Sequence, residues 1–410
     1  MALEHPEAYT VVIASPSQRE QHVRGTYEVW GEAMTPEEWR LVAEKEDDGA
    51  WAQNHGDTTW VLVHKDDITG TVLSSCETYR TKCMLRRPGS SSVEAGWYYG
   101  LTAVVTPVQH CRKGYATHMC RLLHFLLAPA SSLPPFPPEW GSPPPPLPDD
   151  VRTHFPRGLG MVLESLVGTE FYERCTPGLG RAGYTFDKRH SRQLTWKLLG
   201  KSDTAPGPRE DIAGEAGGSH VWDTLSREDV GALVPTLVAT QQARLLRTTS
   251  TRTLIAPDPS SQGFATYLPD HTSLAPRPSW QDVGFPLPFG LRLQHTPTLR
   301  ETDEETPIVL LSFGHFQLVD QLLITCLQGV TPQLLPSLLA TIDRLTAHTP
   351  FTEGWVWGLD PQSELVRAWK GLEGRNVREN LREGDDAFQI GSIWYGFEGE
   401  LADSQMWLVD

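Results

Sequence analysis

Apolar and polar residues over the first third of the chain switch between the spacing of strands and the spacing of helices. Residues 9–14 are apolar and β-branched and predict a strand. Capping-box sequences begin at Ser15 and Thr35, each followed by proline at the first helical position, so we expect two successive helices. Residues 58–64 and 68–80 predict two strands joined by a polar turn. The expected order is therefore strand, helix, helix, strand, strand.

A further strand-like run over residues 93–105 leads through Pro107 into a basic turn that contains Gly114. The turn opens onto a helix, because apolar residues then recur on one helical face, at Met119, Leu122, Leu123, Leu126 and Leu127. Such a turn favours phosphate, since free backbone N–H groups and the positive end of the helix dipole meet there. A plain strand-to-helix connection, in which the glycine serves only the backbone, is the alternative.

Prolines interrupt this pattern over residues 129–148, where they fill ten of the twenty positions. Such a segment forms neither a helix nor a strand ladder, so we expect an extended insertion over residues 129–150. A buried strand, a short helix and a closing pair of strands are expected after it, at residues 161–166, 168–174, 181–186 and 193–198.

Glycine, proline and charged residues dominate residues 201–218, which we interpret as a linker. It separates an N-terminal domain, residues 1–200, from a C-terminal domain, residues 219–410. The second domain mixes helix and strand patterns and is expected to be α+β. Its helices are expected over residues 226–246, 336–347 and 364–372, and its strands over residues 290–294, 307–316, 355–357, 390–397 and 406–409. This half carries no recognisable catalytic signature.

Composition and charge narrow the range of partners. The 410 residues are 39% hydrophobic and 21% charged, as in a globular protein, and the net charge is −16. An acidic chain argues against nucleic acid or an anionic membrane as the main partner and suits a cationic ligand, with ordinary solubility charge as the alternative. The six cysteines lack CxxC spacing, which favours reduced thiols and no zinc site. Neither a signal-peptide pattern nor a run of transmembrane length occurs, so we expect a cytoplasmic protein.

The order of elements resembles that of the GNAT N-acetyltransferase superfamily. The resemblance implies an α/β (α+β) GNAT fold, with a mixed central sheet and flanking helices, followed here by the second α+β domain. The family signature is Arg or Gln, two residues, Gly, one residue, then Gly or Ala. Gly114 and Ala116 match it, whereas Cys111 occupies the Arg or Gln position and Arg112 lies one place later.

Shorter phrases are similar to the fungal lysine N6-acetyltransferase family. They are LSSCET at residues 73–78, VTP at residues 105–107, GYA at residues 114–116 and FY at residues 171–172. The resemblance implies acetyl-CoA as cosubstrate and direct acetyl transfer to a small cationic amine, with the side-chain amine of lysine favoured. Two alternatives stay open: a protein lysine acetyltransferase, and a degenerate GNAT domain that binds CoA or a metabolite without catalysis. The second domain is expected to cover the acceptor side or to support a homodimer.

The resemblance also implies roles for single residues. A backbone N–H of Val104 or Val105 binds the thioester oxygen, and Thr106 lies along the pantetheine arm. The pyrophosphate is expected on the residues of the basic turn and the first helical turn: Arg112, Lys113, Gly114, Tyr115, Ala116 and Thr117. Tyr172 is the expected general acid, with aromatic packing of its helix as the alternative.

The general base is assigned less directly. Glu77 lies on the third predicted strand, next to the strand that binds acetyl-CoA, so its carboxylate is expected to deprotonate the amine or bind a cationic substrate. Glu94 and the terminal carboxylate of Asp410 are the alternatives. Cys76 and Cys111 are expected to be structural, because the family transfers the acetyl group directly and neither thiol has a base that is visible in the sequence.

Overall fold

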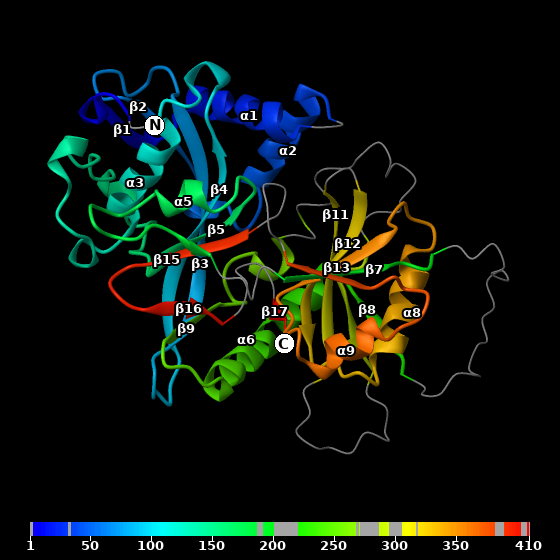
Figure 1. Ribbon diagram of the computed structural model, residues 1–410. Coiled ribbons are helices and arrows are strands. Elements are labelled where there is room, and N and C mark those ends of the chain that lie inside the picture. The colour runs from blue at the N-terminus through cyan, green and yellow to red at the C-terminus, as the bar shows by residue number, and fades with distance from the viewer. Residues whose placement is uncertain are drawn as a thin grey trace. The chain divides into compact units, whose positions relative to one another are not determined.

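The computed structural model describes residues 3–31, 34–186, 192–200, 220–267, 270, 287–294, 306–316, 319–381, 389–402 and 408–409. The chain divides into two compact units, each built on its own sheet (Figure 1). Unit 1 comprises Met1–Lys188, Gln241–Phe264 and Arg382–Gln405, and unit 2 comprises Arg189–Thr240, Ala265–Leu381 and Met406–Asp410. The units thus interleave along the sequence, which differs from two consecutive domains over 1–200 and 219–410. The expected linker, 201–218, lies outside the described residues.

Unit 1 contains a mixed nine-stranded sheet with flanking helices, which is the fold class that the resemblance implies. Its strands are β1 (Tyr9–Ile13), β2 (Asp57–His64), β3 (Ser74–Arg86), β4 (Glu94–Val105), β5 (Gly160–Ser165), β6 (Thr185–Phe186), β9 (Thr253–Pro257), β15 (Gln389–Trp394) and β16 (Gly399–Leu401). Its helices are α1 (Pro16–Trp30), α2 (Pro36–Asp47), α3 (Tyr115–Leu127), α4 (Asp149–Arg152) and α5 (Glu170–Glu173). The main strand order is β1-β2-β3-β4-β5-β15-β6, and β4 and β5 are parallel because α3 crosses between them.

Local sequence fixes where the first two helices begin. The Ser15 hydroxyl accepts the N–H of Gln18, whose side chain accepts the N–H of Ser15 in return. Thr35 and Glu38 form the same reciprocal pair at the start of α2. Both predicted capping boxes are confirmed, and each satisfies two N–H groups that would otherwise lack a helical partner.

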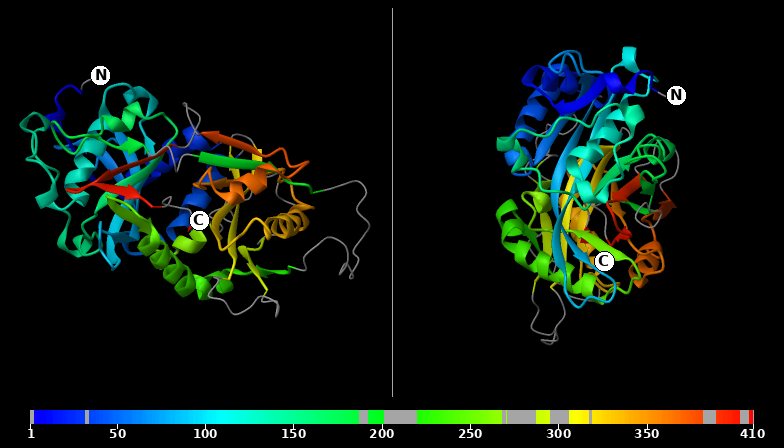
Figure 2. Two further views of the ribbon diagram at one scale, coloured as in Figure 1. Left: turned by 60° about the horizontal axis from the view of Figure 1, so that its bottom comes forward. Right: turned by 90° about the vertical axis from the view of Figure 1, so that its left-hand side faces the viewer.

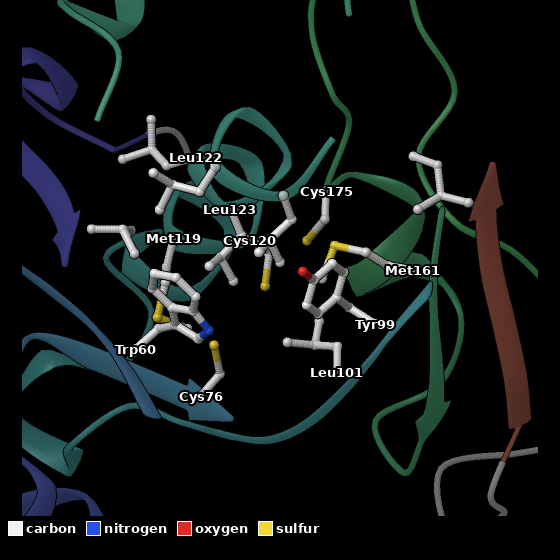
Figure 3. Packing of buried hydrophobic residues seen from close by; sticks show 14 of the residues in the cluster. Trp60, Cys76, Tyr99, Leu101, Met119, Cys120, Leu122, Leu123, Met161 and Cys175 are labelled. Carbon is white, nitrogen blue, oxygen red and sulfur yellow. The ribbon is translucent and has the colours of Figure 1, made fainter. Parts of the chain in front are cut away.

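The two faces of the sheet are covered by different helices. Trp60, Leu101 and Met119 belong to the core between the sheet and α3, and Figure 3 shows this cluster. On the other face, His22 of α1 hydrogen-bonds to side chains of β3. Figures 1 and 2 show α1 and α2 on one side of this sheet and α3 with α5 on the other. Successive residues of β3 therefore face different helices.

Two details of the strand pattern differ from expectation. The predicted strand over 68–80 is β3, which begins only at Ser74, because the buried Gln18 amide donates to the carbonyls of Ile68 and Gly70 and holds that segment as a turn. The predicted closing strands do not pair with each other. β6 pairs with β15 in unit 1, whereas β7 (Arg192–Lys197) joins the sheet of unit 2.

The proline-rich insertion is extended, as predicted, with two 3₁₀ turns of three residues within residues 129–148. It folds against the outer side of α3. The rings of Phe125, Phe136 and Trp140 pack edge to face, and the Arg121 guanidinium lies 5.3 Å from the Trp140 ring centre. The insertion therefore buries aromatic surface of α3 that would otherwise face water.

Unit 2 is α+β, as expected. Its eight-stranded sheet has the main order β14-β7-β13-β12-β11-β10-β8, with β17 beside β12. The strands, besides β7, are β8 (Trp222–Leu225), β10 (Gly290–Leu293), β11 (Ile308–Phe316), β12 (Val319–Gln328), β13 (Glu353–Trp357), β14 (Arg378–Leu381) and β17 (Leu408–Val409). The helices are α6 (Arg227–Arg247), which continues into unit 1, α8 (Leu335–Thr346) and α9 (Glu364–Lys370). Within the described ranges, no helix has both the length and the apolar character needed to cross a bilayer.

Candidate functional site

The strands β4 and β5 part in the middle of the unit 1 sheet. Their ladder pairs Tyr99 with Met161 and ends with Leu101 opposite Leu163. Beyond that point β5 continues beside β15, where Ile390 lies opposite Glu164. The last four residues of β4, 102–105, therefore have no partner in β5. A gap of this kind places unpaired edges of two parallel strands next to each other.

A β-bulge lies at the point where the strands part. Thr102 of β4 is opposite Glu77 of β3, and Val105 is opposite Ser75. Ala103 and Val104 consequently face the single residue Cys76, and Ala103 has a φ of 49°. A non-glycine residue in this region costs about 1–2 kcal/mol, and bulges re-aim the backbone beside functional sites. The bulge brings Val104 to the gap, and Val105 follows it; either of these residues is predicted to bind the thioester oxygen.

Side chains hold the chain that leaves β4. The Ser74 hydroxyl lies 3.0 Å from the Val105 carbonyl and 3.0 Å from the Thr106 hydroxyl. Ser74 donates to the carbonyl, so Thr106 must donate to Ser74. Cys111 is exposed, and its thiol donates to the Thr106 carbonyl at 3.3 Å. Cys111 thus makes a hydrogen bond within its own loop, in agreement with a structural role.

The backbone of the basic turn leads directly into the N-terminus of α3. A 3₁₀ turn, Val108–His110, precedes Arg112 and Gly114, whose φ angles are 62° and 90°. α3 then begins at Tyr115. A Cβ on Gly114 would lie 3.2 Å from the backbone nitrogen of Leu3, so this position needs glycine for both its φ and its surroundings.

The charges at this turn are available to a ligand. Arg112 and Lys113 are exposed, and neither makes an ion pair within the part of the chain that the structure describes. Tyr115, Ala116 and Thr117 are half-buried in the first turn of α3. Two cations and the N–H groups of a helix N-terminus are thus brought together, as phosphate binding requires.

Tyr172 is buried on the α3 side of the sheet. Its ring packs edge to face against Phe171 and Tyr184, which fits the packing role. Burial raises the pKa of its phenol well above the usual value, and the nearby thiols Cys120 and Cys175 add to the shift. The phenol therefore keeps its proton at neutral pH, which a general acid also requires. Figure 3 shows these thiols and Cys76 in the same cluster.

Glu77 lies on the opposite face, in a polar network that the sequence did not reveal. Its Oε1 atom lies 3.0 Å from Nε2 of His22 and 3.4 Å from Nη1 of Arg19. Burial alone would raise the pKa of the Glu77 carboxyl, but His22 and Arg19 outweigh it and the pKa is lowered. His22 in turn contacts the Ser75 hydroxyl through Nδ1 at 2.8 Å. Glu77 is therefore ionised at neutral pH and held in one orientation.

The polar partners of Glu77 have a signal in the sequence of α1. Gln18, His22 and Thr26 recur every four residues, and these are the buried residues of the helix. The apolar residues Val23, Tyr27 and Trp30 of the same helix, which also share one helical face, are only half-buried. A polar stripe at helical spacing could have indicated that α1 turns hydrogen-bonding groups toward the sheet.

The other candidate bases lie elsewhere or outside the described residues. Glu94 begins β4, at the opposite end of that strand from the bulge, and its carboxylate pairs with Arg87 at 3.1 Å. Asp410 lies outside the described residues. Among the residues that are described, no group of three or more His, Cys, Asp or Glu side chains is arranged to hold a metal ion.

No protein-family model and no curated protein matches the sequence. Solved structures are similar in architecture. The GCN5-related N-acetyltransferase from Kribbella flavida is 10% identical, with 95% of this chain and 71% of that chain covered and a TM-score of 0.49. The GCN5-related N-acetyltransferase from Anabaena variabilis is 10% identical, with 94% of this chain and 72% of that chain covered and a TM-score of 0.44.

A GNAT family acetyltransferase from Brucella melitensis, solved in complex with acetyl-CoA, is 14% identical over 41% of this chain and 81% of that chain, with a TM-score of 0.22. These TM-scores lie below 0.5. The assignment of the fold therefore rests on this chain's own strand order, the parallel β4–β5 pair and the helix that crosses between them.

Proposed function

We propose that this chain is an acetyl-CoA-dependent N-acetyltransferase that acts on a small cationic amine, with the side-chain amine of lysine as the favoured acceptor. The observation that carries the proposal is the parting of β4 from β5 directly after Leu101, beside the bulge at Ala103–Val104. An acyl donor can add its own polar groups to such an unpaired strand edge. The anion-binding turn at the start of α3 follows a few residues later in the same chain.

The donor would be held by groups already described. Arg112, Lys113 and the first N–H groups of α3 supply charge and hydrogen bonds for the pyrophosphate. The unpaired end of β4 receives the pantetheine arm, with Thr106 beside it. A backbone N–H of Val104 or Val105 binds the thioester oxygen as negative charge develops on it. One such donor contributes roughly a hundredfold to a thousandfold to the rate in acyl transfer.

The reaction itself needs two proton transfers. The neutral amine attacks the thioester carbon, and the nitrogen then loses a proton to the Glu77 carboxylate. The carbon–sulfur bond breaks with its electron pair on sulfur, and Tyr172 returns a proton to the thiolate. An ionised carboxylate and a phenol that keeps its proton match these two roles.

Charge supports a cationic acceptor. The carboxyl groups of Asp47, Asp57 and Glu77 lie near one another, and Arg19 is bonded to Asp47 and Glu77. Burial and the Glu77 charge raise the pKa of the Asp57 carboxyl well above its usual value, so the negative charge of this cluster is assigned to Asp47 and Glu77. The net charge of −16 acts in the same direction over a longer range. The preference for lysine rests on the resemblance to the fungal lysine N6-acetyltransferase family.

The proposal is tested by incubating the protein with acetyl-CoA and a panel of free amines and by following CoA release. We expect release with L-lysine, and a lower rate with a lysine-containing peptide than with the free amino acid. Faster turnover of the peptide would favour a protein acetyltransferase instead. Acetyl-CoA binding without release for any amine would reject catalysis and leave a CoA-binding domain.

A further inference from the structure

A line of three hydrogen-bonded side chains runs from α1 to the middle of the unit 1 sheet. The Ser75 hydroxyl contacts Nδ1 of His22 at 2.8 Å, and Nε2 of His22 contacts Oε1 of Glu77 at 3.0 Å. Ser75 and Glu77 are two residues apart on β3, so both point to the α1 face. A hydroxyl, an imidazole and a carboxylate in this order resemble the components of a proton-transfer site.

The hydrogen-bond chemistry fixes the orientation of the imidazole. An ionised carboxylate only accepts hydrogen bonds, so Nε2 of His22 carries a proton that it donates to Glu77. A serine hydroxyl can either donate or accept, and it therefore suits Nδ1 whether or not that atom is protonated. His22 thus keeps both partners in either charge state, and Glu77 keeps its position.

The two carboxylate oxygens of Glu77 have different surroundings. Oε1 receives both His22 and Arg19, and within the described chain no protein group is bonded to Oε2. The side chain of Glu77 is 15% exposed, whereas that of His22 is 1% exposed. Only the carboxylate therefore has access to a substrate.

The exposed side of Glu77 adjoins the proposed reaction centre. Thr102, its partner across the ladder, is exposed although β4 is an interior strand. The next residues along β4 are Ala103 and Val104, which form the bulge. The α1 face of the sheet is thus open to a ligand at Thr102, beside the position proposed for the thioester.

On the premise of the proposed acetyl transfer, we propose that His22 is a positioning residue: it holds Oε1 of Glu77 and leaves Oε2 as the atom that takes the proton from the acceptor amine. In this step an N–H bond of the ammonium that forms when the amine attacks the thioester breaks, its electron pair stays on nitrogen, and an O–H bond forms at Oε2. The proton passes to solvent after the product leaves. Ser75 fixes the imidazole from behind.

Kinetics of matched variants test this assignment. His22→Leu removes both hydrogen bonds, whereas His22→Gln keeps an N–H donor for Glu77. We expect His22→Leu to lower kcat for L-lysine at least about tenfold with an unchanged KM for acetyl-CoA, and His22→Gln to recover part of the loss. Gln18→Leu is the control, because Gln18 lies one turn earlier on α1, is equally buried and does not touch Glu77.

A pH profile separates positioning from packing. The charged or titratable groups around Glu77 are Arg19 and His22 on α1, Asp47 on α2 and Asp57 on β2. Without His22 the carboxylate loses its stabilising partner, so the acidic limb of the kcat profile should move upward by about one pH unit in His22→Leu. The acceptor's own titration is common to both proteins and cancels in the ratio of variant to wild type. A profile and a kcat equal to those of Gln18→Leu would overturn the assignment.

A second measurement does not depend on turnover. In ¹⁵N NMR spectra of the full chain, the Nε2 resonance of His22 should shift in Glu77→Gln, and the Nδ1 resonance should shift in Ser75→Ala. If neither substitution changes the ¹⁵N chemical shifts of His22, the positioning role is overturned even if the wild type acetylates amines. If the resonances shift but no amine is acetylated, the proposed function is wrong. The hydrogen bonds of His22 to Ser75 and Glu77 are then confirmed, but they do not serve acetyl transfer.

Discussion

Cys76 and Glu77 are neighbours on β3 and face opposite sides of the sheet. Cys76 lies in the core under α3, close to the phenol of Tyr172, whereas Glu77 is bonded to His22 of α1. The proposed acid and the proposed base are thus on different faces of one sheet. On the proposed mechanism, the parting of β4 from β5 after Leu101 would let a single reacting centre be reached from both faces.

The role of Tyr172 is tested by removing its hydroxyl. Tyr172→Phe should lower kcat about a hundredfold while the Kd for acetyl-CoA stays the same, because only the proton donor is lost. Stopped assays of CoA release and calorimetric titration measure the two quantities. Tyr184→Phe is the matched control, since that ring is buried beside Tyr172 and its hydroxyl contacts Met161 Sδ. Equal kcat values for Tyr172→Phe and the wild type would leave only the packing role.

The cations of the basic turn should set the affinity for the donor. Arg112→Ala is expected to raise the Kd for acetyl-CoA about tenfold, since hydrogen bonds to charged groups contribute roughly 1.5–3 kcal/mol, and the effect should shrink at high salt. Arg87→Ala, at an exposed arginine beside Glu94, serves as the control. An Arg112→Ala protein with the wild-type Kd would exclude a phosphate contact from this side chain.

Two separate effects should make a side chain at position 114 destabilising: the positive φ of Gly114 and its close approach to Leu3. Gly114→Ala should lower the free energy of unfolding by more than the roughly 1–2 kcal/mol expected from its positive φ alone, because the new Cβ would also crowd Leu3. Gly89→Ala isolates the first cost, since Gly89 has a φ of 73° and open space around it. Urea unfolding of both variants measures the difference, and equal losses would show that Leu3 yields without cost.

Two buried histidines predict loss of stability in mild acid. Burial lowers the pKa of His118 and of His124 from 6.5 to about 4. His124 is bonded as a neutral ring, donating to the Cys175 carbonyl and accepting from the Tyr395 hydroxyl. The unfolded chain binds these protons more readily than the folded chain. Their contribution to stability is therefore complete above pH 6.5 and is lost as the pH falls toward 4.

The expected slope is up to about 1.4 kcal/mol per pH unit for each of the two histidines. Urea midpoints at pH 7 and pH 5 measure it. His124→Phe should weaken the pH dependence, while substitution of the exposed His5 should leave it unchanged. A His124→Phe protein with the wild-type slope would show that His124 does not carry this linkage.

Cys111 should report on occupancy of the basic turn. It is exposed, whereas the other five cysteines are buried. Iodoacetamide should therefore modify Cys111 first, as mass spectrometry of the peptides would show, and saturating acetyl-CoA should slow that reaction several-fold by covering the turn. An alkylation rate that is independent of acetyl-CoA would place the donor elsewhere.

Local patterns allowed the sequence to predict much of unit 1. Capping boxes at Ser15 and Thr35 and the apolar face of α3 are decided by neighbours in the chain, and they were found where expected. β12 was missed, since Leu322–Leu327 form a buried apolar run without the alternation of a half-exposed strand. β15 was assigned to the wrong sheet and β9 was overlooked, because their partners lie 146 residues or more away in the sequence.

The site divides in the same way. The residues of the basic turn, Gly114 among them, are consecutive in the sequence, so the turn could be predicted from the sequence alone. The bulge at Ala103 and the network of Arg19, His22 and Glu77 arise only when α1 is laid across β3. His22 and Glu77 are 55 residues apart in the sequence, and their positions in it could not show that they form a hydrogen bond.

The return of β15 to the first sheet bears on how the protein is made. β5 carries its outer partner only when residues 389–394 have been added, and the far end of β3 is completed by β9 and β16. A nascent chain that has emerged only as far as residue 200 exposes the edge of β5, and an open edge recruits strands from other molecules. Synthesis must therefore run past residue 401 before this sheet can close, and expression of the first 200 residues alone should yield an aggregating fragment.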